Sequence, residues 1–62
     1  MKRRDLEKEL TICGWKLIRN GGNHDVWGNG KGEQEPVPRH REVSELLAKK
    51  IIRTAKAHPG EK

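Results

Sequence analysis

The sequence predicts a small α+β domain in which a helix, three antiparallel strands and a second helix form a two-layer sandwich, with both helices on one face of the sheet. Apolar residues have helical spacing at both ends of the chain, while the middle contains short strand-forming runs separated by glycine-rich turns. Short strands joined by tight turns are typical of an antiparallel meander. We therefore expect the order α-β-β-β-α as one domain over residues 1–58, followed by a flexible tail at residues 59–62.

The first helix is predicted over residues 3–13. Leu6, Leu10 and Cys13 recur at i, i+4 and i+7, so they share one face of a helix. Gly14 follows and can adopt, at low cost, the left-handed conformation that ends many helices. Lys2 is a poor N-cap, so this helix lacks the usual polar cap at its start.

Three strands are predicted over residues 15–19, 24–27 and 33–37, with turns at residues 20–23 and 28–32. The first strand alternates apolar and polar residues. Pro36 and Pro38 restrict the third strand to an edge of the sheet, because proline has no amide to donate. We expect Trp15 in the core and favour the core for Trp27 as well, although an outward-facing Trp27 would stack on a base or contact a partner.

The last helix begins after Ser44, which is a good N-cap. Its predicted apolar face consists of Val43, Leu47, Ala48, Ile51, Ile52 and Ala55. Lys49, Arg53 and Lys56 recur at i, i+4 and i+7 and form a basic stripe on the opposite side. Leu46 falls outside the apolar face, near this stripe.

The chain has 62 residues, of which 14 are Lys or Arg and 9 are Asp or Glu, for a net charge of +5. This length excludes a multidomain enzyme or a doubly wound cofactor-binding sheet. No apolar run is long enough to span a membrane, and no signal peptide is visible, so we expect a cytoplasmic protein without a membrane partner. The single Cys13 excludes an internal disulfide.

Positive charge is concentrated in the two flanks. Residues 1–20 carry six basic and three acidic groups, and residues 39–62 carry seven basic and three acidic groups. The middle, residues 21–38, carries one basic and three acidic groups. A basic domain favours polyanions, and phosphate backbones are the commonest polyanions in the cytoplasm.

The predicted first turn contains the clearest local signal for chemistry, Gly21-Gly22-Asn23-His24. Two glycines let the backbone approach a ligand closely, and amides in such a turn can bind phosphate oxygens. A histidine beside the turn is a candidate general base or acid for phosphodiester cleavage. The alternative is an ordinary hairpin turn followed by an exposed strand residue.

The segment after the third strand, Pro38-Arg39-His40-Arg41, contains a second candidate cluster. Guanidinium groups match paired phosphate oxygens, but this segment can equally be a solvated loop. Whether His40 assists catalysis, positions RNA or is simply exposed stays open. The cysteine and the three histidines lack the short paired spacing of a zinc site, so we expect no metal and no cofactor.

In their order and spacing, these motifs resemble the HicA toxin family. The resemblance covers nearly the whole chain: a helix ending in Gly14-Trp15, a strand, Gly22-Asn23-His24, a third strand closing on Pro38-Arg39-His40, and an amphipathic helix. It implies a fold like that of double-stranded-RNA-binding domains. It also implies a toxin that cleaves messenger RNA and is held inactive by a HicB antitoxin, with any DNA contact coming through the antitoxin complex.

The resemblance assigns the catalytic histidine to His24. The next position, often histidine or apolar in relatives, is Asp25 here. We expect an endoribonuclease that needs no metal, because RNA supplies its own 2′-hydroxyl nucleophile. The expected RNA-binding residues are Gly21, Gly22, Asn23, Arg39, Arg41, Lys49, Arg53 and Lys56. The alternative is a non-catalytic module of the same fold that binds RNA or DNA, and a less favoured one is an interaction domain with no nucleic-acid role.

Overall fold

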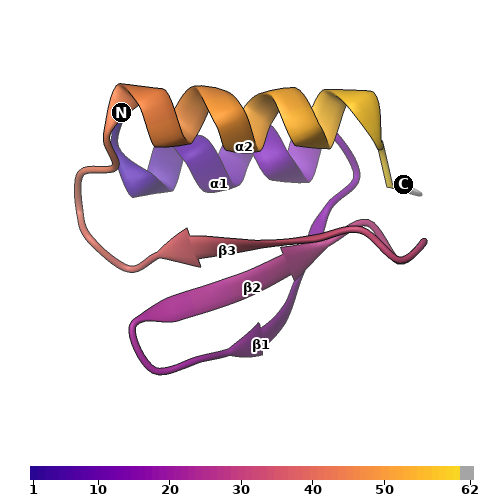
Figure 1. Cartoon of the computed structure of the whole chain (residues 1–62), viewed down its shortest axis with the longest axis horizontal. Coiled ribbons are helices and arrows are strands. Elements are labelled where there is room, and N and C mark those ends of the chain that lie inside the picture. Colours follow the sequence, from indigo (N-terminus) through magenta and orange to yellow (C-terminus); the bar gives the residue numbers. More distant parts are fainter. Residues whose placement is uncertain (61–62) are drawn as a thin grey trace.

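Five elements follow one another in the predicted order in the computed structural model, which describes residues 1–60 (Figure 1). They are α1 (Arg3–Ile12), β1 (Lys16–Asn20), β2 (His24–Gly28), β3 (Gln34–Pro38) and α2 (Glu45–Ala57). The two helices lie side by side on one face of the sheet (Figure 1). The predicted α-β-β-β-α fold is confirmed, and the predicted bounds of α1 and of the three strands are within one residue of the observed ones. Neither helix is long and apolar enough to cross a bilayer.

The sheet is an antiparallel meander in the order β1-β2-β3, with β2 in the centre. In the β2–β3 register, Val26 lies opposite Pro36 and His24 opposite Pro38. The two prolines are two residues apart, so their nitrogens point the same way, toward the free edge where no amide is needed. The prediction that β3 is an edge strand is confirmed.

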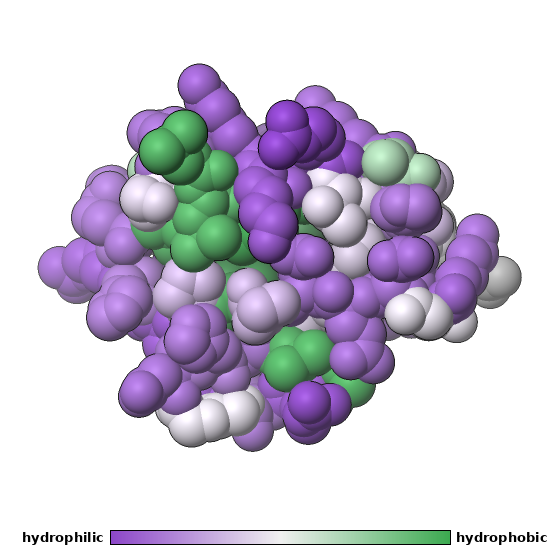
Figure 2. All heavy atoms as spheres, viewed as in Figure 1, coloured by the Kyte–Doolittle hydropathy of each residue, from purple (hydrophilic) through white to green (hydrophobic). Residues whose placement is uncertain are grey.

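The other edge strand, β1, is exposed along its whole length. Its pairing with β2 is interrupted by a bulge between Leu17 and Arg19. Leu17 and Ile18 remain 48% and 46% exposed. The alternation of apolar and polar residues in β1 therefore does not bury its apolar side chains, because the helices do not cover this edge of the sheet (Figure 1). On the face seen in Figure 2, separate hydrophobic patches interrupt an otherwise hydrophilic surface.

The core lies between the helices and the sheet. Leu6 and Leu10 of α1 are fully buried, and both tryptophans are buried, as expected. The core consists of Leu6, Leu10, Trp15, Trp27, Val37, Val43, Ala48, Ile51 and Ala55. Leu46 is 86% exposed, which confirms its place outside the apolar face of α2.

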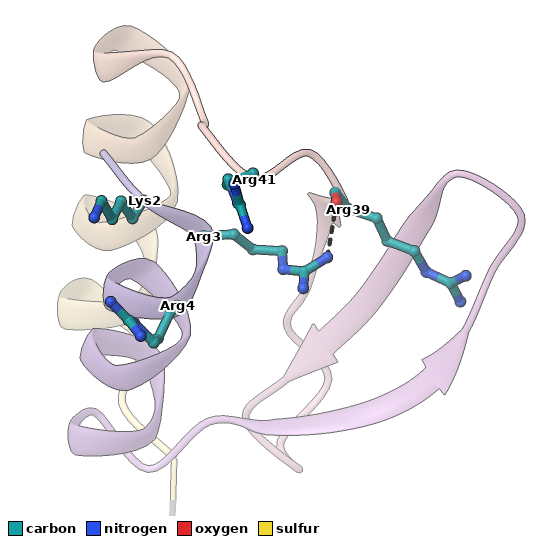
Figure 3. A pocket seen from close by; sticks show the side chains of 5 residues that line it. All are labelled: Lys2, Arg3, Arg4, Arg39 and Arg41. Atoms are coloured by element: carbon teal, nitrogen blue, oxygen red, sulfur yellow. Dashed lines mark hydrogen bonds between the residues drawn. The ribbon is translucent and has the colours of Figure 1, made fainter.

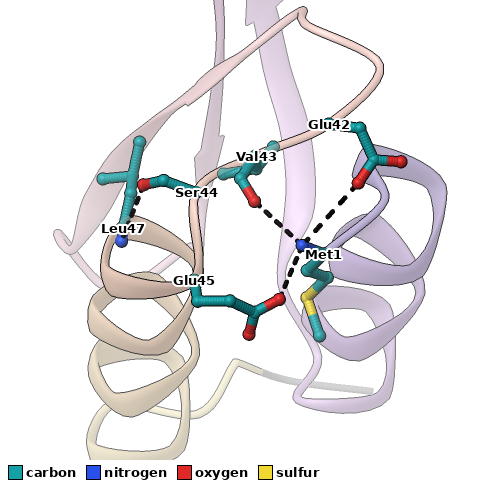
Figure 4. A network of polar contacts seen from close by, with 6 residues as sticks. All are labelled: Met1, Glu42, Val43, Ser44, Glu45 and Leu47. Carbon is teal, nitrogen blue, oxygen red and sulfur yellow. Dashed lines mark hydrogen bonds and ion pairs between the residues drawn. The ribbon is translucent and has the colours of Figure 1, made fainter.

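The two helices begin in different ways. Ser44 caps α2, its side chain accepting a hydrogen bond from the Leu47 amide at 3.3 Å, as predicted (Figure 4). Lys2 makes no side-chain cap for α1. Instead, the amide of Arg3 donates to the carbonyl of Arg41 at 2.9 Å, so a distant loop satisfies one of the free amides of the first turn.

The start of the chain is joined to the start of α2 (Figure 4). The Met1 ammonium group donates to the Val43 carbonyl at 2.9 Å and to Glu45 Oε1 at 2.7 Å, and Glu42 Oε1 lies 4.0 Å away. The hydrogen bond to Glu45 is the main reason why the pKa of the Met1 ammonium group is raised. The same hydrogen bond lowers the pKa of Glu45.

The end of α2 is held at the opposite end of the sandwich. The His58 carbonyl accepts hydrogen bonds from Trp15 Nε1 at 2.8 Å and from Asn29 Nδ2 at 3.1 Å. The amide of Gly60 donates to the Cys13 carbonyl at 2.8 Å. Of the predicted tail, residues 59–60 therefore follow α2 back toward the end of α1, while Glu61 and Lys62 lie outside the described residues.

Candidate active site

His24 begins β2 and is exposed at one end of the sheet. Successive side chains of a strand point to opposite faces. Trp27 is buried beneath the helices, so Asp25 shares its face while His24 and Val26 point to the other. The imidazole is therefore presented on the face of the sheet that carries no helix, directly opposite Pro38 in the ladder.

The turn before His24 is closed by a backbone hydrogen bond from the Gly21 amide to the His24 carbonyl at 2.8 Å. A Cβ at Gly21 would lie 2.5 Å from that oxygen, so a close backbone approach explains this glycine. Nothing lies within 4 Å of a Cβ placed at Gly22. Since the Gly21 amide is already used inside the turn, Gly22 and Asn23 remain as the amides of the predicted phosphate cradle.

The loop after β3 is fastened to the same end of the sheet. The Arg39 amide donates to the Asn23 carbonyl at 3.2 Å, which ties the predicted Arg39–Arg41 segment to the His24 turn. Arg39 Nε also lies 2.7 Å from Asp25 Oδ1, in an ion pair whose carboxylate side chain is only 15% exposed. Asp25 thus holds Arg39 on the helix side of the sheet, and its carboxylate lies on the opposite face from the imidazole of His24.

His40 and Arg41 follow in the same loop and are both exposed. No hydrogen bond of the His40 side chain occurs within residues 1–60, so its position beside Arg39 is set by the backbone alone. The structure therefore brings the two predicted clusters, the His24 turn and the Arg39–Arg41 loop, to one end of the sheet.

The basic stripe of α2 lies elsewhere. Lys49, Arg53 and Lys56 are exposed, while Ala48 and Ile51 bury the other side of the helix against the core. Figure 1 shows that α2 lies on one face of the sheet, whereas the register of β2 directs His24 to the other face, so the helix that carries the stripe and the imidazole are on opposite sides of the sheet.

Basic residues at the start of the chain adjoin the Arg39–Arg41 loop. Lys2, Arg3 and Arg4 line a cavity of about 480 Å³ together with Arg39 and Arg41 (Figure 3). Arg3 reaches across it, and its Nη1 donates to the Arg39 carbonyl at 2.7 Å (Figure 3). The run Lys2-Arg3-Arg4 is plain in the sequence, but its meeting with a loop some 36 residues away is a tertiary contact that no local pattern indicates.

Within residues 1–60, no three His, Cys, Asp or Glu side chains form a group that could hold a metal ion. The titratable side chains at the His24 end include the imidazoles of His24 and His40, the paired Asp25 carboxylate and a set of cations.

These features define a class of protein: a small α+β domain with an exposed histidine at a hairpin and a basic cavity at the same end of its sheet. The family model described as the HicA toxin of bacterial toxin–antitoxin systems matches residues 3–57. The chain belongs to the HicA toxin family, and membership implies a cognate antitoxin as partner. No curated protein and no solved structure matches the chain.

Proposed function

We propose that this chain is the toxin of a toxin–antitoxin pair and acts in the cytoplasm as a metal-independent endoribonuclease on messenger RNA, with His24 as its catalytic residue and a HicB antitoxin as its inhibitor. The observation that carries the proposal is the exposed His24 imidazole on the uncovered face of the sheet, beside a loop whose Arg39 is hydrogen-bonded to the His24 turn. Membership of the HicA toxin family supports the toxin role.

In the proposed reaction, His24 removes the proton of an RNA 2′-hydroxyl, and the resulting oxygen attacks the adjacent phosphorus. The bond from phosphorus to the 5′-oxygen of the next nucleotide breaks, and this oxygen takes up a proton from solvent water. The products are a 5′-hydroxyl end and a 2′,3′-cyclic phosphate, or the 3′-phosphate that forms when water opens the cyclic phosphate. The amides of Gly22 and Asn23 are the groups that would stabilise the charge on the cleaved phosphate, while Arg39 and Arg41 would hold the RNA backbone beside it.

The usual size of general base catalysis limits how much one histidine can accelerate the reaction. Proton transfer by a positioned side chain accelerates a reaction by about 10²–10⁴-fold. The rest of the rate acceleration must come from electrostatic stabilisation of the phosphate by the surrounding amides and cations. An enzyme with one histidine and no acid partner is therefore expected to be slow.

The proposal predicts that His24→Ala abolishes cleavage of a messenger RNA, with a loss of at least about 10²-fold in rate, and also abolishes growth inhibition in cells. His58→Ala is the matched control, because His58 is also exposed and only its backbone groups make hydrogen bonds within residues 1–60. Cleavage by the unchanged chain should persist in EDTA, leave cyclic-phosphate ends and stop when the antitoxin is added.

Equal cleavage by the His24→Ala and His58→Ala variants would overturn the catalytic assignment. Binding of RNA without cleavage by the unchanged chain would instead favour the non-catalytic nucleic-acid-binding module.

A further inference from the structure

The cavity lined by Lys2, Arg3, Arg4, Arg39 and Arg41, here called the basic cavity, combines cations from two distant segments. We propose that it is a subsite for a backbone phosphate of the RNA substrate, next to the phosphate that is cleaved. The choice of RNA as ligand rests on the proposed function, whereas the site itself rests on the meeting of these two segments. Figure 3 shows Arg3 reaching the Arg39 backbone carbonyl, while the Arg39 guanidinium group extends away from the other four side chains.

The position of the basic cavity relates it to His24. Its Arg39 follows Pro38, which lies opposite His24 in the ladder, and the Arg39 amide is bonded to the Asn23 carbonyl. The ion pair with Asp25 directs Arg39 to the helix side of the sheet, whereas His24 points to the other side. A phosphate in the basic cavity therefore belongs to a nucleotide that bends around the end of the sheet, beside the one at His24.

The charges of the basic cavity indicate an anionic ligand. Arg3 Nη1 is used to hold the Arg39 carbonyl, Arg3 Nε lies 3.9 Å from Glu7, and Arg39 Nε is paired with Asp25. Within residues 1–60, the side chains of Lys2, Arg4 and Arg41 make no hydrogen bond or ion pair. Cations held close together repel one another unless an anion neutralises them.

The type of cation distinguishes phosphate from other anions. Four of the five lining residues are arginines, whose planar guanidinium groups bind paired phosphate oxygens in two parallel hydrogen bonds. The cavity is a hollow of about 480 Å³ between α1 and the β3–α2 loop. A hollow of this size fits a phosphate and its ribose more closely than it fits the flat surface of a partner protein. We therefore assign it to RNA and treat antitoxin contact as the competing outcome.

The test measures RNA binding without cleavage, in the His24→Ala background, by fluorescence anisotropy of a short oligoribonucleotide. Arg4→Ala and Arg41→Ala are the test variants, because both side chains are exposed and neither supports the fold through a side-chain contact. Lys31→Ala is the control, since it removes the same charge from the exposed β2–β3 turn.

Each test variant is expected to weaken RNA binding about tenfold and to reduce the slope of log affinity against log salt by about 0.7, the value for one contact to single-stranded backbone. Lys31→Ala should change affinity by less than about twofold. A set of oligonucleotides with one neutral methylphosphonate each should then contain one position where neutralisation weakens binding to the parent but not to Arg4→Ala.

Two results would overturn the subsite. One is RNA affinity and salt slope for Arg4→Ala and Arg41→Ala that match those of Lys31→Ala. The other is a loss of antitoxin binding in the test variants with RNA binding unchanged, which would assign the basic cavity to the antitoxin. Cleavage by the unchanged chain is measured separately, so failure of the proposed ribonuclease activity is distinguishable from failure of the subsite.

Discussion

Asn29 lies in a glycine-rich segment that the sequence predicts to be a plain hairpin turn, yet its side chain is only 5% exposed and joins three parts of the chain. Its Oδ1 accepts hydrogen bonds from the amides of Lys31 and Glu33 at 2.7 and 3.1 Å. Its Nδ2 donates to the His58 carbonyl beyond α2. One amide side chain therefore shapes the β2–β3 turn and attaches the end of α2 to it.

Asn29→Ala is expected to lower the free energy of unfolding by about 1–3 kcal/mol, because two turn amides and the His58 carbonyl lose a partner. Chemical denaturation followed by tryptophan fluorescence measures this change. Asn20→Ala is the control, since Asn20 is exposed and its side chain makes no hydrogen bond within residues 1–60; its effect should stay within about 0.5 kcal/mol. Equal effects of the two substitutions would contradict the role of Asn29.

Single residues of the candidate site differ in how far the sequence predicts them. His24 stands out because glycines and a histidine adjoin in the chain, so a local pattern carries the prediction. The part played by Asp25 depends on Arg39, which is 14 residues away, and on the face of β2 that each residue occupies. Such pairings follow from strand register, which the composition of one strand does not determine.

Among the elements, the two helices show the same contrast. The start of α2 is predictable because Ser44 caps it with its own side chain. The start of α1 is not, because its first amide is satisfied by Arg41, and this contact also creates the basic cavity. Local capping chemistry is visible in a sequence, whereas a cap supplied by a distant backbone carbonyl is not.

The contact between the Met1 ammonium group and Glu45 makes the start of α2 sensitive to pH. The pKa of the ammonium group is raised above its ordinary value of 8.0, so its stabilising effect is complete below that value and is lost as pH rises through the raised pKa. The pKa of Glu45 is lowered below its ordinary value of 4.5, so its effect is complete above that value and is lost as pH falls through the lowered pKa.

For the chain that begins at Met1, Glu45→Gln is therefore expected to lower Tm most at about pH 6–7, with the difference narrowing at both extremes of pH. Thermal melts across the pH range measure it, and added salt should reduce the difference because the pair is exposed. Glu33→Gln, which removes an exposed carboxylate with no ion pair within residues 1–60, is the matched control. A Glu45→Gln effect that is independent of pH would contradict the assignment.

For the whole molecule, the order of elements and most of the core are predictable from the sequence. The spacing of apolar residues and the glycine-rich turns are patterns of residues close together in the chain. The arrangement of charge in space is not. The chain carries a net charge of +5, and both the α2 stripe and the Arg39–Arg41 segment appear equally suited to RNA in the sequence. Only the layer order shows that the loop adjoins His24 while Lys49, Arg53 and Lys56 lie on the other side of the sandwich.

The closure of the fold at the end of α2 gives the last prediction, which also tests where the domain ends. Trp15 Nε1 and Asn29 Nδ2 both donate to the carbonyl of His58, and the Gly60 amide donates to Cys13. A chain shortened to residues 1–57 loses all three hydrogen bonds. Trp15 is only 1% exposed, so its indole NH would be left buried without a partner. We expect a loss of at least about 2 kcal/mol, equivalent to roughly 8–16 °C in Tm for a domain of this size. Differential scanning calorimetry of the full chain, the 1–57 chain and a 1–58 chain measures the effect, and the 1–58 chain should recover much of it because it keeps the oxygen atoms of His58. If the 1–57 chain has the same Tm as the full chain, the contacts beyond α2 contribute nothing to stability and the domain ends with the helix.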